Sequence, residues 1–304
     1  MTTTSSNDLF EDDLDLPDPG AQQRYARLIG LDHVKTRLAK EAELILQPHL
    51  LREWSLRAHN TVLPAVDRLT HRPPLIIFAG DVGTGKTTLA ETFADAIARR
   101  HRIDVRVKRL SLRARGTGAV GEMTQLIGTA FDVVLDEARA AGSTRPTILV
   151  IDEADALAQS REASQMHHED RAGVNALIRG ISQIATEAPG VLVIMCTNRI
   201  GALDPAIRRR AAAEFDFIRP DETQRAAILT ALFEGVHLSP SDLEHLVELT
   251  GPDGRGYGHT YSDLVDRVLA ATCLAAYPDR PVTAQLIAEQ IRTCPPTPPF
   301  TAQS

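Results

Sequence analysis

The sequence predicts an α/β fold in which a parallel β-sheet lies between two layers of helices, followed by a small all-helical domain. Short apolar runs of strand length recur over residues 75–217, and such runs are typical of strands buried on both faces of a parallel sheet. Segments with helical periodicity separate these runs, which implies right-handed crossover connections. After Pro220 the strand-like runs stop, and only helical patterns follow.

The predicted elements alternate along the chain. The strand candidates are Leu75–Ala79, Val105–Leu110, Thr147–Ile151, Val191–Cys196 and Glu214–Phe217. The helix candidates repeat apolar residues at helical spacing: Gln22–His59 with a break at Gly30–Asp32, Thr88–Arg100, Ile127–Ala141, Val174–Ile184, Thr223–Phe233, Ser241–Leu249, Thr260–Ala276 and Thr283–Arg292. This alternation predicts a three-layer αβα arrangement, with the last helices set apart from the sheet.

We expect two domains between two loose ends. Residues 21–219 form the large α/β domain with its N-terminal helices, and residues 220–293 form the helical domain. Residues 1–20 are acidic and contain too few apolar groups to offset the entropy of ordering, so we expect a disordered tail. Residues 294–304 are proline-rich and are expected to be flexible.

Composition narrows the class of protein. The 304 residues are 43% hydrophobic and 24% charged, which is typical of a soluble globular chain. No apolar run reaches the roughly 18–20 residues needed to cross a bilayer, and no signal-peptide pattern opens the chain. The cysteines Cys196, Cys273 and Cys294 form neither a disulfide framework nor a metal pair. We therefore expect a cytoplasmic protein with no membrane partner.

Net charge bears on the kind of partner. The formal charge of −7 disfavours broad nucleic-acid binding, which needs clustered cations to replace counterions. Local basic clusters nevertheless occur at Arg99–Arg102, Arg106–Arg115 and Arg208–Arg210. A focused DNA contact stays open as an alternative, while the charge balance favours a protein partner.

A phosphate-binding loop follows the first predicted strand. Residues 80–87 read Gly-Asp-Val-Gly-Thr-Gly-Lys-Thr and fit the pattern G-x-x-x-x-G-K-[ST]. The glycines let backbone N–H groups curl around phosphate oxygens, while the next helix offers its positive end. Lys86 is expected to reach the β- and γ-phosphates of ATP, and the Thr87 hydroxyl to bind Mg²⁺. The predicted nucleotide-binding residues are Gly80, Asp81, Val82, Gly83, Thr84, Gly85, Lys86, Thr87, Thr88 and Asp152.

A pair of acidic residues, Asp152 and Glu153, ends the third predicted strand. In open α/β sheets, ligands bind at the carboxyl ends of the strands. Asp152 is expected to hold Mg²⁺ together with Thr87, and Glu153 to polarise the water that attacks the γ-phosphate. An acidic helix start is the alternative, since Asp155 also fits a first helical turn. The phosphate loop upstream favours the catalytic interpretation.

Two further predicted elements of the site follow the phosphate loop and the acidic pair along the chain. Asn198 ends the next strand, where a side-chain amide would orient the water or sense the γ-phosphate; a turn-forming asparagine is the alternative. Arg209 and Arg210 come next, and arginine suits the neutralisation of charge on a transferring phosphoryl group. We predict that both act on a neighbouring subunit's site, although an exposed basic helix end would give the same pattern.

These elements, in this order, resemble the AAA branch of the AAA+ ATPases over residues 25–292. The resemblance implies Mg²⁺-dependent ATP hydrolysis by a ring, usually a hexamer, in which Arg209 and Arg210 reach the next subunit's site. It also implies that residues 220–293 form the lid. Arg208 fits less well the positions of the family's arginine fingers, which are the arginines that reach the neighbouring site. Gly256–Leu264 resembles a stretch of the family's lid domain, but it has no evident arginine at the position called the second sensor.

Residues 148–162 and 170–184 are similar to the Pch2/Trip13 remodellers. Members of that clade act on HORMA-domain proteins, and short bacterial relatives accompany anti-phage nucleotide-signalling operons. The resemblance therefore implies an ATPase that remodels a protein partner, with a HORMA-like protein as the candidate. A nucleic-acid-dependent ATPase of a transposition or defence system is the alternative. A nucleotide-gated scaffold without hydrolysis would need neither Glu153 nor Asn198.

The chain departs from the AAA translocases at the pore loop, where an aromatic residue is replaced by Ala119. An aromatic side chain grips a threaded polypeptide by its contact area, and alanine offers little. Arg113 and Arg115 make the preceding loop basic. We therefore expect limited remodelling of a partner rather than processive threading.

Overall fold

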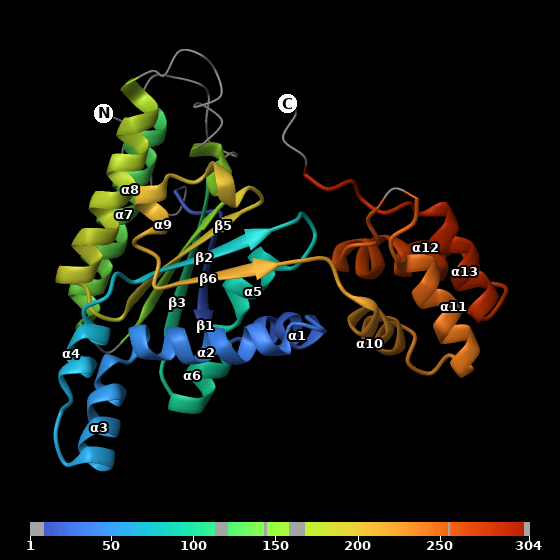
Figure 1. Cartoon of the computed structure of the whole chain (residues 1–304), viewed down its shortest axis with the longest axis horizontal. Helices are drawn as coiled ribbons and strands as arrows, with labels where there is room; N and C mark the ends of the chain where they lie inside the picture. Colours follow the sequence, from blue (N-terminus) through green and yellow to red (C-terminus); the bar gives the residue numbers. More distant parts are fainter. Residues whose placement is uncertain (1–8, 113–120, 143–144, 158–167, 255, 301–304) are drawn as a thin grey trace. The chain divides into compact units, whose positions relative to one another are not determined.

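The computed structural model describes residues 9–112, 121–142, 145–157, 168–254 and 256–300 (Figure 1). The chain divides into two compact units. The first, which holds the sheet, comprises the residues up to Ala26, His33–Ala79 and Thr87–Asp216. The second, which is helical, comprises Arg27–Asp32, Gly80–Lys86 and the chain from Phe217 onward.

A six-stranded sheet in the order β1-β3-β4-β5-β2-β6 forms the centre of the first unit. Its strands are β1 (Asp12–Leu16), β2 (Leu75–Gly80), β3 (Val105–Ser111), β4 (Thr147–Asp152), β5 (Val191–Thr197) and β6 (Ala213–Phe217). The pairs β3–β4, β4–β5 and β5–β2 are parallel, as predicted. Strands β2, β4 and β5 are largely apolar because helices cover both faces of the sheet. Strand β3 differs, since it carries Arg106, Lys108 and Arg109.

Strand β1 corrects the prediction that residues 1–20 lack fixed structure. Asp12–Leu16 pairs antiparallel with β3, so that Asp12 lies opposite Arg109 and Leu16 opposite Val105. The acidic residues that suggested a solvated tail instead face cations: Asp13 accepts hydrogen bonds from Arg106 at 2.6 Å and from Lys108 at 2.8 Å. Cross-strand pairing and burial of Leu16 offset the entropy of ordering this segment. Residues 1–8 lie outside the described part.

Asp13→Ala is expected to lower the free energy of unfolding by about 1–3 kcal/mol, because the buried ammonium of Lys108 loses one of its carboxylate partners. The Lys108 side chain is only 2% exposed, and Glu137 at 3.1 Å remains as its second partner. The matched control on the same strand is Asp12→Ala, whose carboxylate is 56% exposed and should contribute under about 1 kcal/mol. Urea-unfolding midpoints measure the difference, and equal midpoints for the two variants would contradict this role of Asp13.

The same carboxylate makes the stability depend on pH. Burial alone would raise the pKa of Asp13, but the hydrogen bonds from Arg106 and Lys108 outweigh burial and lower it. A group whose pKa is lowered in the folded state contributes its full stability above its unfolded pKa. The contribution of Asp13 is therefore lost as the pH falls through its folded pKa.

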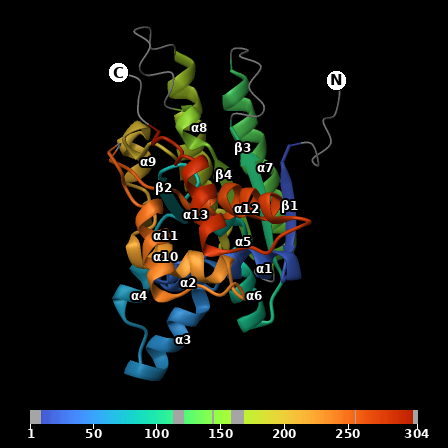
Figure 2. The same ribbon diagram turned by 90° about the vertical axis from the view of Figure 1, so that its right-hand side faces the viewer.

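Helices cover both faces of the sheet (Figures 1 and 2). The helices up to β6 are α1 (Pro19–Arg27), α2 (Asp32–Leu46), α3 (Pro48–His59), α4 (Pro64–Thr70), α5 (Lys86–Thr92), α6 (Ala94–His101), α7 (Glu122–Ala141), α8 (His168–Glu187) and α9 (Pro205–Arg208). Helices α7 and α8 lie side by side, and a Cβ at Gly180 would be 2.3 Å from the Phe131 ring. They pack on Leu149 and Ile151 of β4. Among the described residues, no helix is long and apolar enough to cross a membrane.

The helix predicted over Thr88–Arg100 is divided at Phe93 into α5 and α6. The Thr92 hydroxyl donates to the Thr88 carbonyl over 2.6 Å, and this bond within the helix is of a kind that bends helices. Helix α4 was not predicted. It begins at Pro64, whose fixed φ suits a first helical turn.

The second unit is built from short capped helices around a core of its own. They are α10 (Glu222–Leu232), α11 (Pro240–Thr250), the π-helical segment η6 (Asp263–Val268), α12 (Leu269–Ala276) and α13 (Ala284–Thr293). Helices α10 and α11 begin with capping boxes at Asp221 and Ser239. Ile228, Leu246 and Ile287 are buried together in the core.

Two features of this unit differ from the prediction. The loop Gly80–Lys86 groups with the helices rather than with the α/β domain, because the Ser262 N–H donates to the Gly83 carbonyl over 2.9 Å. Residues 294–300, expected to be flexible, are tied down: the Thr297 N–H and hydroxyl both donate to Asp263, over 3.0 and 2.6 Å. Residues 301–304 lie outside the described part.

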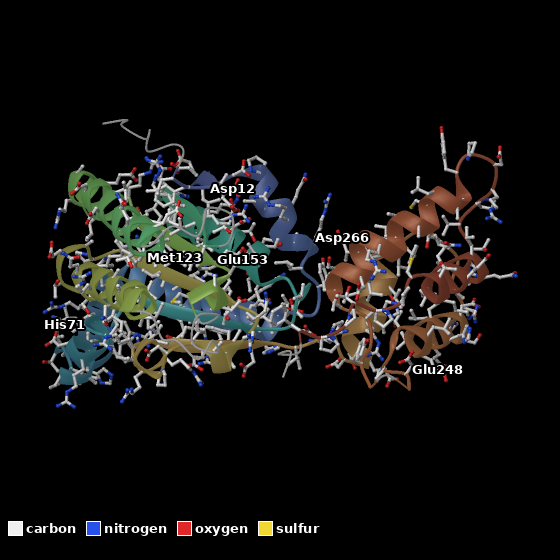
Figure 3. The ribbon with its side chains drawn as sticks, turned by 90° about the horizontal axis from the view of Figure 1, so that it is seen from above. Asp12, His71, Met123, Glu153, Glu248 and Asp266 are labelled. Atoms are coloured by element: carbon white, nitrogen blue, oxygen red, sulfur yellow. The ribbon has the colours of Figure 1, made fainter. Side chains whose placement is uncertain are left out.

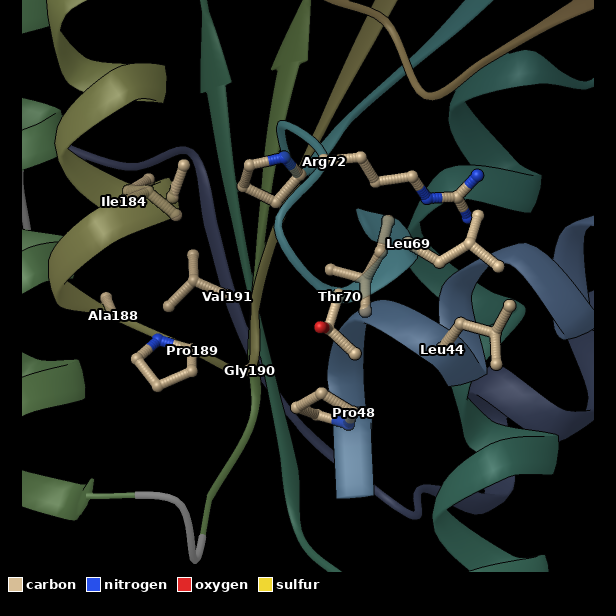
Figure 4. Close-up of a pocket in the computed structure, with 13 residues that line it drawn as sticks. Leu44, Pro48, Leu69, Thr70, Arg72, Ile184, Ala188, Pro189, Gly190 and Val191 are labelled. Carbon is tan, nitrogen blue, oxygen red and sulfur yellow. The ribbon is translucent and has the colours of Figure 1, made fainter. Parts of the chain in front are cut away.

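A pocket in the first unit lies at the amino end of β5 (Figure 4). It is lined by Leu44 of α2, Pro48 of α3, Leu69 of α4, Ile184 of α8 and Val191, the first residue of β5. The predicted catalytic residues Glu153 and Asn198 follow the carboxyl ends of β4 and β5. This pocket is therefore separate from them.

Candidate active site

The predicted metal ligands Thr87 and Asp152 lie together in the first unit. The Thr87 hydroxyl, near the start of α5, donates to Asp152 Oδ2 over 3.0 Å. With Mg–O bonds of 2.0–2.1 Å, neighbouring ligands of an octahedral Mg²⁺ lie about 2.9 Å apart. The two oxygens are therefore spaced as neighbouring Mg²⁺ ligands would be. Oxygen donors of this kind, completed by water and phosphate, are the set that Mg²⁺ prefers.

Glu153 follows directly and is held by its own partners. Its backbone is left-handed, with φ of 54°, and its N–H donates to Asp152 Oδ1 over 2.9 Å. The Ser111 hydroxyl donates to Glu153 Oε2 over 3.1 Å. A non-glycine residue in this region is strained, and such strain is often found at functional sites. Figure 3 shows Glu153 in the α/β unit.

Ser111 is a residue that the sequence prediction missed. Ser111 lies opposite Asp152 in the register of β3 and β4, and Asp152 is the residue directly before Glu153. The available signal in the sequence was the polar residue Ser111 itself, which directly follows the predicted strand Val105–Leu110. Its hydroxyl donates to the Glu153 carboxylate and so helps to orient it.

Arg109 is the nearest cation to the acidic pair for which an ion pair is described. Its Nη1 lies 3.9 Å from Asp152 Oδ2, while Nε and Nη2 face Glu91 at 3.1 Å and Asp12 at 2.7 Å. Burial raises the pKa of Glu91, although Arg109 opposes that shift. In the sequence, Arg109 belongs to the basic cluster Arg106–Arg115, which left a focused DNA contact open. The structure instead places it among carboxylates beside the predicted magnesium ligand.

Asn198 follows the end of β5, the strand next to β4. Its backbone N–H donates to Asp155 Oδ1 over 3.4 Å, and Asp155 is fully buried. Asp155 therefore does more than start a helical turn, because its carboxylate holds the loop that carries Asn198. Glu153 and Asn198 thus leave the sheet from adjacent parallel strands.

Arg209 and Arg210 follow the short helix α9, which Asp204 caps by accepting from the Ala206 N–H at 2.7 Å. Arg209 Nε donates to the Pro205 carbonyl over 3.2 Å, and Arg210 Nη1 to the Ala206 carbonyl over 2.9 Å. Both guanidinium groups thus bond within their own turn. Arg209 is exposed and Arg210 is half-buried.

Arg208 differs from these neighbours because it pairs with Glu214 at 3.0 Å. The hydrogen bond to Glu214 raises the pKa of the Arg208 guanidinium. An arginine engaged by a carboxylate of its own chain is less suited to a phosphate in another subunit. This distinction agrees with the weaker fit of Arg208 to the finger positions.

The phosphate loop Gly80–Lys86 is folded within the second unit. Gly80 has φ of 147°, and a Cβ there would lie 2.0 Å from the Phe217 carbonyl oxygen, so no other residue fits. Lys86 is 7% exposed, and its ammonium donates to the carbonyls of Gly80 at 3.0 Å and Asp81 at 2.7 Å. The loop therefore curls around a positive charge, as a polyphosphate site requires.

A small pocket that the sequence did not predict lies beside Thr84. It is lined by Ile29, Gly30, Leu31, Ile218, Ile228 and Tyr261, among others. The Gly30 carbonyl accepts from Gln224 Nε2 over 2.6 Å, which fixes one wall. The break at Gly30–Asp32 was the available signal, but it was interpreted only as the end of a helix.

Residues 76–219 match the ATPase family associated with various cellular activities (AAA). The chain belongs to this family of AAA ATPases. Within the family, it is similar to CD-NTase-associated protein 6 of Escherichia coli (strain MS 115-1), with 47% identity over 302 residues, 97% of each protein. CD-NTase-associated protein 6 of E. coli (strain KTE188) is 38% identical over 295 residues, which cover 97% of this chain and 98% of that protein.

Solved structures agree with this assignment. A chain of the E. coli MS115-1 HORMA:CdnC:Trip13 complex superposes with a TM-score of 0.88 and 47% identity, covering 98% of this chain and 99% of that one. Rhizobiales Trip13 superposes with a TM-score of 0.75 and 39% identity, covering 95% and 100% of the two chains. The predicted αβα fold with a helical C-terminal region and the resemblance to the Trip13 remodellers are both confirmed.

Proposed function

We propose that this chain is an oligomeric, Mg²⁺-dependent ATPase that remodels a HORMA-domain protein in a bacterial anti-phage system. The observation that carries the proposal is similarity over nearly the whole chain to Trip13 in a HORMA:CdnC:Trip13 complex and to CD-NTase-associated protein 6. The reaction converts ATP and water to ADP and phosphate. The low cysteine content without disulfide spacing supports the cytoplasm as its compartment.

The described geometry supports a role for each predicted residue. Lys86 and the N–H groups of its loop bind the phosphates, and Thr87 with Asp152 would hold Mg²⁺, which neutralises charge on the β- and γ-phosphates when bound. Glu153, oriented by the Ser111 hydroxyl, accepts a proton from the attacking water. Asn198 orients the same water from the adjacent strand.

Arg209 and Arg210 are proposed to complete the site of a neighbouring subunit in a ring, which we take to be a hexamer. In the described residues, their guanidinium groups donate to uncharged carbonyls of their own turn, whereas Arg208 pairs with the carboxylate of Glu214. Exchanging a carbonyl for a phosphate oxygen is favourable because the new bond joins opposite charges. ATP would thereby link adjacent subunits.

A nucleic-acid-dependent ATPase is less well supported. It depended on the basic cluster Arg106–Arg115, and the described cations of that cluster already face acids. Lys108 lies 2.8 Å from Asp13 and 3.1 Å from Glu137, and Arg106 lies 2.6 Å from Asp13. Cations paired in this way release no counterions from a nucleic acid. Arg113 and Arg115 lie outside the described residues.

The way in which the chain remodels its partner is proposed from the sequence alone. Ala119, at the position of the pore-loop aromatic, also lies outside the described residues. Because alanine offers little area for gripping a polypeptide, we propose local unfolding or reshaping of the partner rather than complete threading.

The partner proposal is tested by trapping. With ATP and Mg²⁺, the Glu153→Gln variant is expected to co-elute in size-exclusion chromatography with a HORMA-domain protein from the same organism, because bound ATP is not consumed. The wild-type chain is expected to release the partner as ATP is hydrolysed. Lys86→Ala is the control that should form no complex, since it lacks the phosphate-binding ammonium. If Glu153→Gln binds ATP but never the HORMA-domain protein, this partner is wrong.

A further inference from the structure

Asp81 places a carboxylate in the phosphate-binding loop. The motif accepts any residue at this position, so its carboxylate is not needed to grip phosphate. A negative charge in this loop repels a polyphosphate unless a cation neutralises it. In the structure, Arg219 Nε donates to Asp81 Oδ2 over 2.6 Å, with both side chains largely buried at 14% and 17% exposure. Arg219 thus removes the repulsion and ties the loop to the chain after β6.

The other nitrogens of Arg219 are also engaged. Nη1 donates to the Gly258 carbonyl over 2.6 Å, and Nη2 to the Thr297 carbonyl over 2.7 Å. The guanidinium also stacks on Tyr257, with its central carbon 5.0 Å from the ring centroid. A planar group with donors on every side is fixed in orientation by this set of acceptors. Arg219 is therefore a rigid link to Asp81 rather than a mobile cation.

Thr297 belongs to the C-terminal segment Pro295–Phe300, which is itself anchored. Asp263, 1% exposed, accepts from the Thr297 N–H and hydroxyl and from Arg267 Nη1, the last over 2.7 Å. Burial alone would raise the pKa of Asp263, but these hydrogen bonds outweigh burial and hold its pKa well below the usual range. The carboxylate that anchors the segment therefore stays charged at neutral pH.

The end of the same segment contacts the loop directly. The Phe300 N–H donates to Asp81 Oδ1 over 3.3 Å, and the Val82 N–H donates to the same oxygen over 2.9 Å. Asp81 is therefore held by its own loop, by Arg219 and by the C-terminal segment. All of these residues belong to the second unit.

We propose that Arg219 is a positioning residue for ATP binding, which neutralises and holds Asp81 of the phosphate loop while the C-terminal segment Pro295–Phe300 clamps Arg219. The inference rests on the proposed function, because it assumes that the loop binds ATP. It goes further in assigning two parts that no motif contains. Neither contacts the nucleotide directly; both act through the shape and charge of the loop.

The test is equilibrium binding of a fluorescent, slowly hydrolysed ATP analogue to the full chain with Mg²⁺. Arg219→Ala is expected to weaken binding about 10- to 100-fold, the range for losing a charged hydrogen bond. Made in an Asp81→Asn background, the same substitution should weaken binding less than about threefold, because no buried charge is left unpaired. Arg280→Ala, an exposed arginine of the same unit, is the control expected to bind like wild type.

The clamp is tested by Thr297→Pro, which removes both donors to Asp263 while keeping the carbonyl that Arg219 uses. Binding is expected to weaken about 3- to 10-fold, less than for Arg219→Ala, because Arg219 is loosened but not lost. Binding equal to that of Arg280→Ala would overturn the clamp.

The outcomes separate this inference from the proposed function. A wild-type chain that binds no analogue would overturn the proposed ATPase itself. Tight binding by wild type and by Arg219→Ala alike would overturn only the role of Arg219. Equal weakening by Arg219→Ala in both backgrounds would show a general structural effect, and would also overturn the inference.

Discussion

Glu153→Gln is expected to reduce ATP turnover about 100- to 10,000-fold, the usual contribution of a general base. Glutamine keeps the size of the side chain and can still accept from the Ser111 hydroxyl, which now donates to Glu153 over 3.1 Å. It cannot take a proton from water. Binding should persist because the phosphate loop and the Thr87–Asp152 pair are untouched. Phosphate release at saturating ATP measures turnover, and calorimetric titration with ATP measures binding.

Glu248→Gln is the matched control for that prediction. Glu248 is exposed on α11 of the helical unit (Figure 3). Its substitution makes the same change from glutamate to glutamine, away from the predicted site. Its turnover should equal that of the wild type. If Glu153→Gln kept half or more of the wild-type turnover, the acid pair would serve only to begin the helical turn after β4, as the alternative interpretation of the sequence holds.

The arrangement around Asp152 could be predicted because it depends on local patterns at strand ends. Parallel strands bring their carboxyl ends to one edge of a sheet, so a motif after β2 and acids after β4 are expected near one another. The 3.0 Å contact of Thr87 with Asp152 follows from that rule. Continuous apolar runs identified β2, β4 and β5 because these strands are buried on both faces of the sheet.

Strand β1 could not be predicted because its stability lies in a partner far along the chain. Asp13 is separated from Arg106 by 93 residues, and nothing local distinguishes a paired acid from a solvated one. Charge counting treated the acidic start and the basic run Arg106–Arg115 as independent features. The structure shows that Arg106 and Lys108 of this run pair with Asp13, which weakens the support for nucleic-acid binding.

The same limit applies to Arg219 and Thr297. The bond between Arg219 and Asp81 spans 138 residues, and the motif marks Asp81 only as a variable position. A proline-rich end is commonly loose, so Thr297 gave no sign of its two bonds to Asp263. Sequence patterns thus located the groups expected to meet ATP, but not the groups that hold them in place.

Arg209→Ala and Arg210→Ala are each expected to lower ATP turnover in the assembled protein, by about 1,000-fold for the arginine that contacts the transferring phosphoryl group. Arg208→Ala is the control on the same turn, and it should keep most of the activity because Arg208 is engaged by Glu214 at 3.0 Å. Phosphate release at saturating ATP ranks the three. Equal losses would contradict the distinction drawn between Arg208 and its neighbours.

Mixing two inactive variants decides whether these arginines act between subunits. A subunit carrying Glu153→Gln keeps its arginines, and a subunit carrying Arg209→Ala with Arg210→Ala keeps its glutamate. In randomly mixed rings, roughly one interface in four then joins an intact glutamate to an intact arginine pair, so turnover should recover towards that fraction of wild type. Arginines that served their own subunit would give no recovery, because every subunit would still lack one of the two groups. Recovery that requires mixing therefore establishes a site shared by neighbours, and its absence in a mixture shown to form joint rings would contradict it.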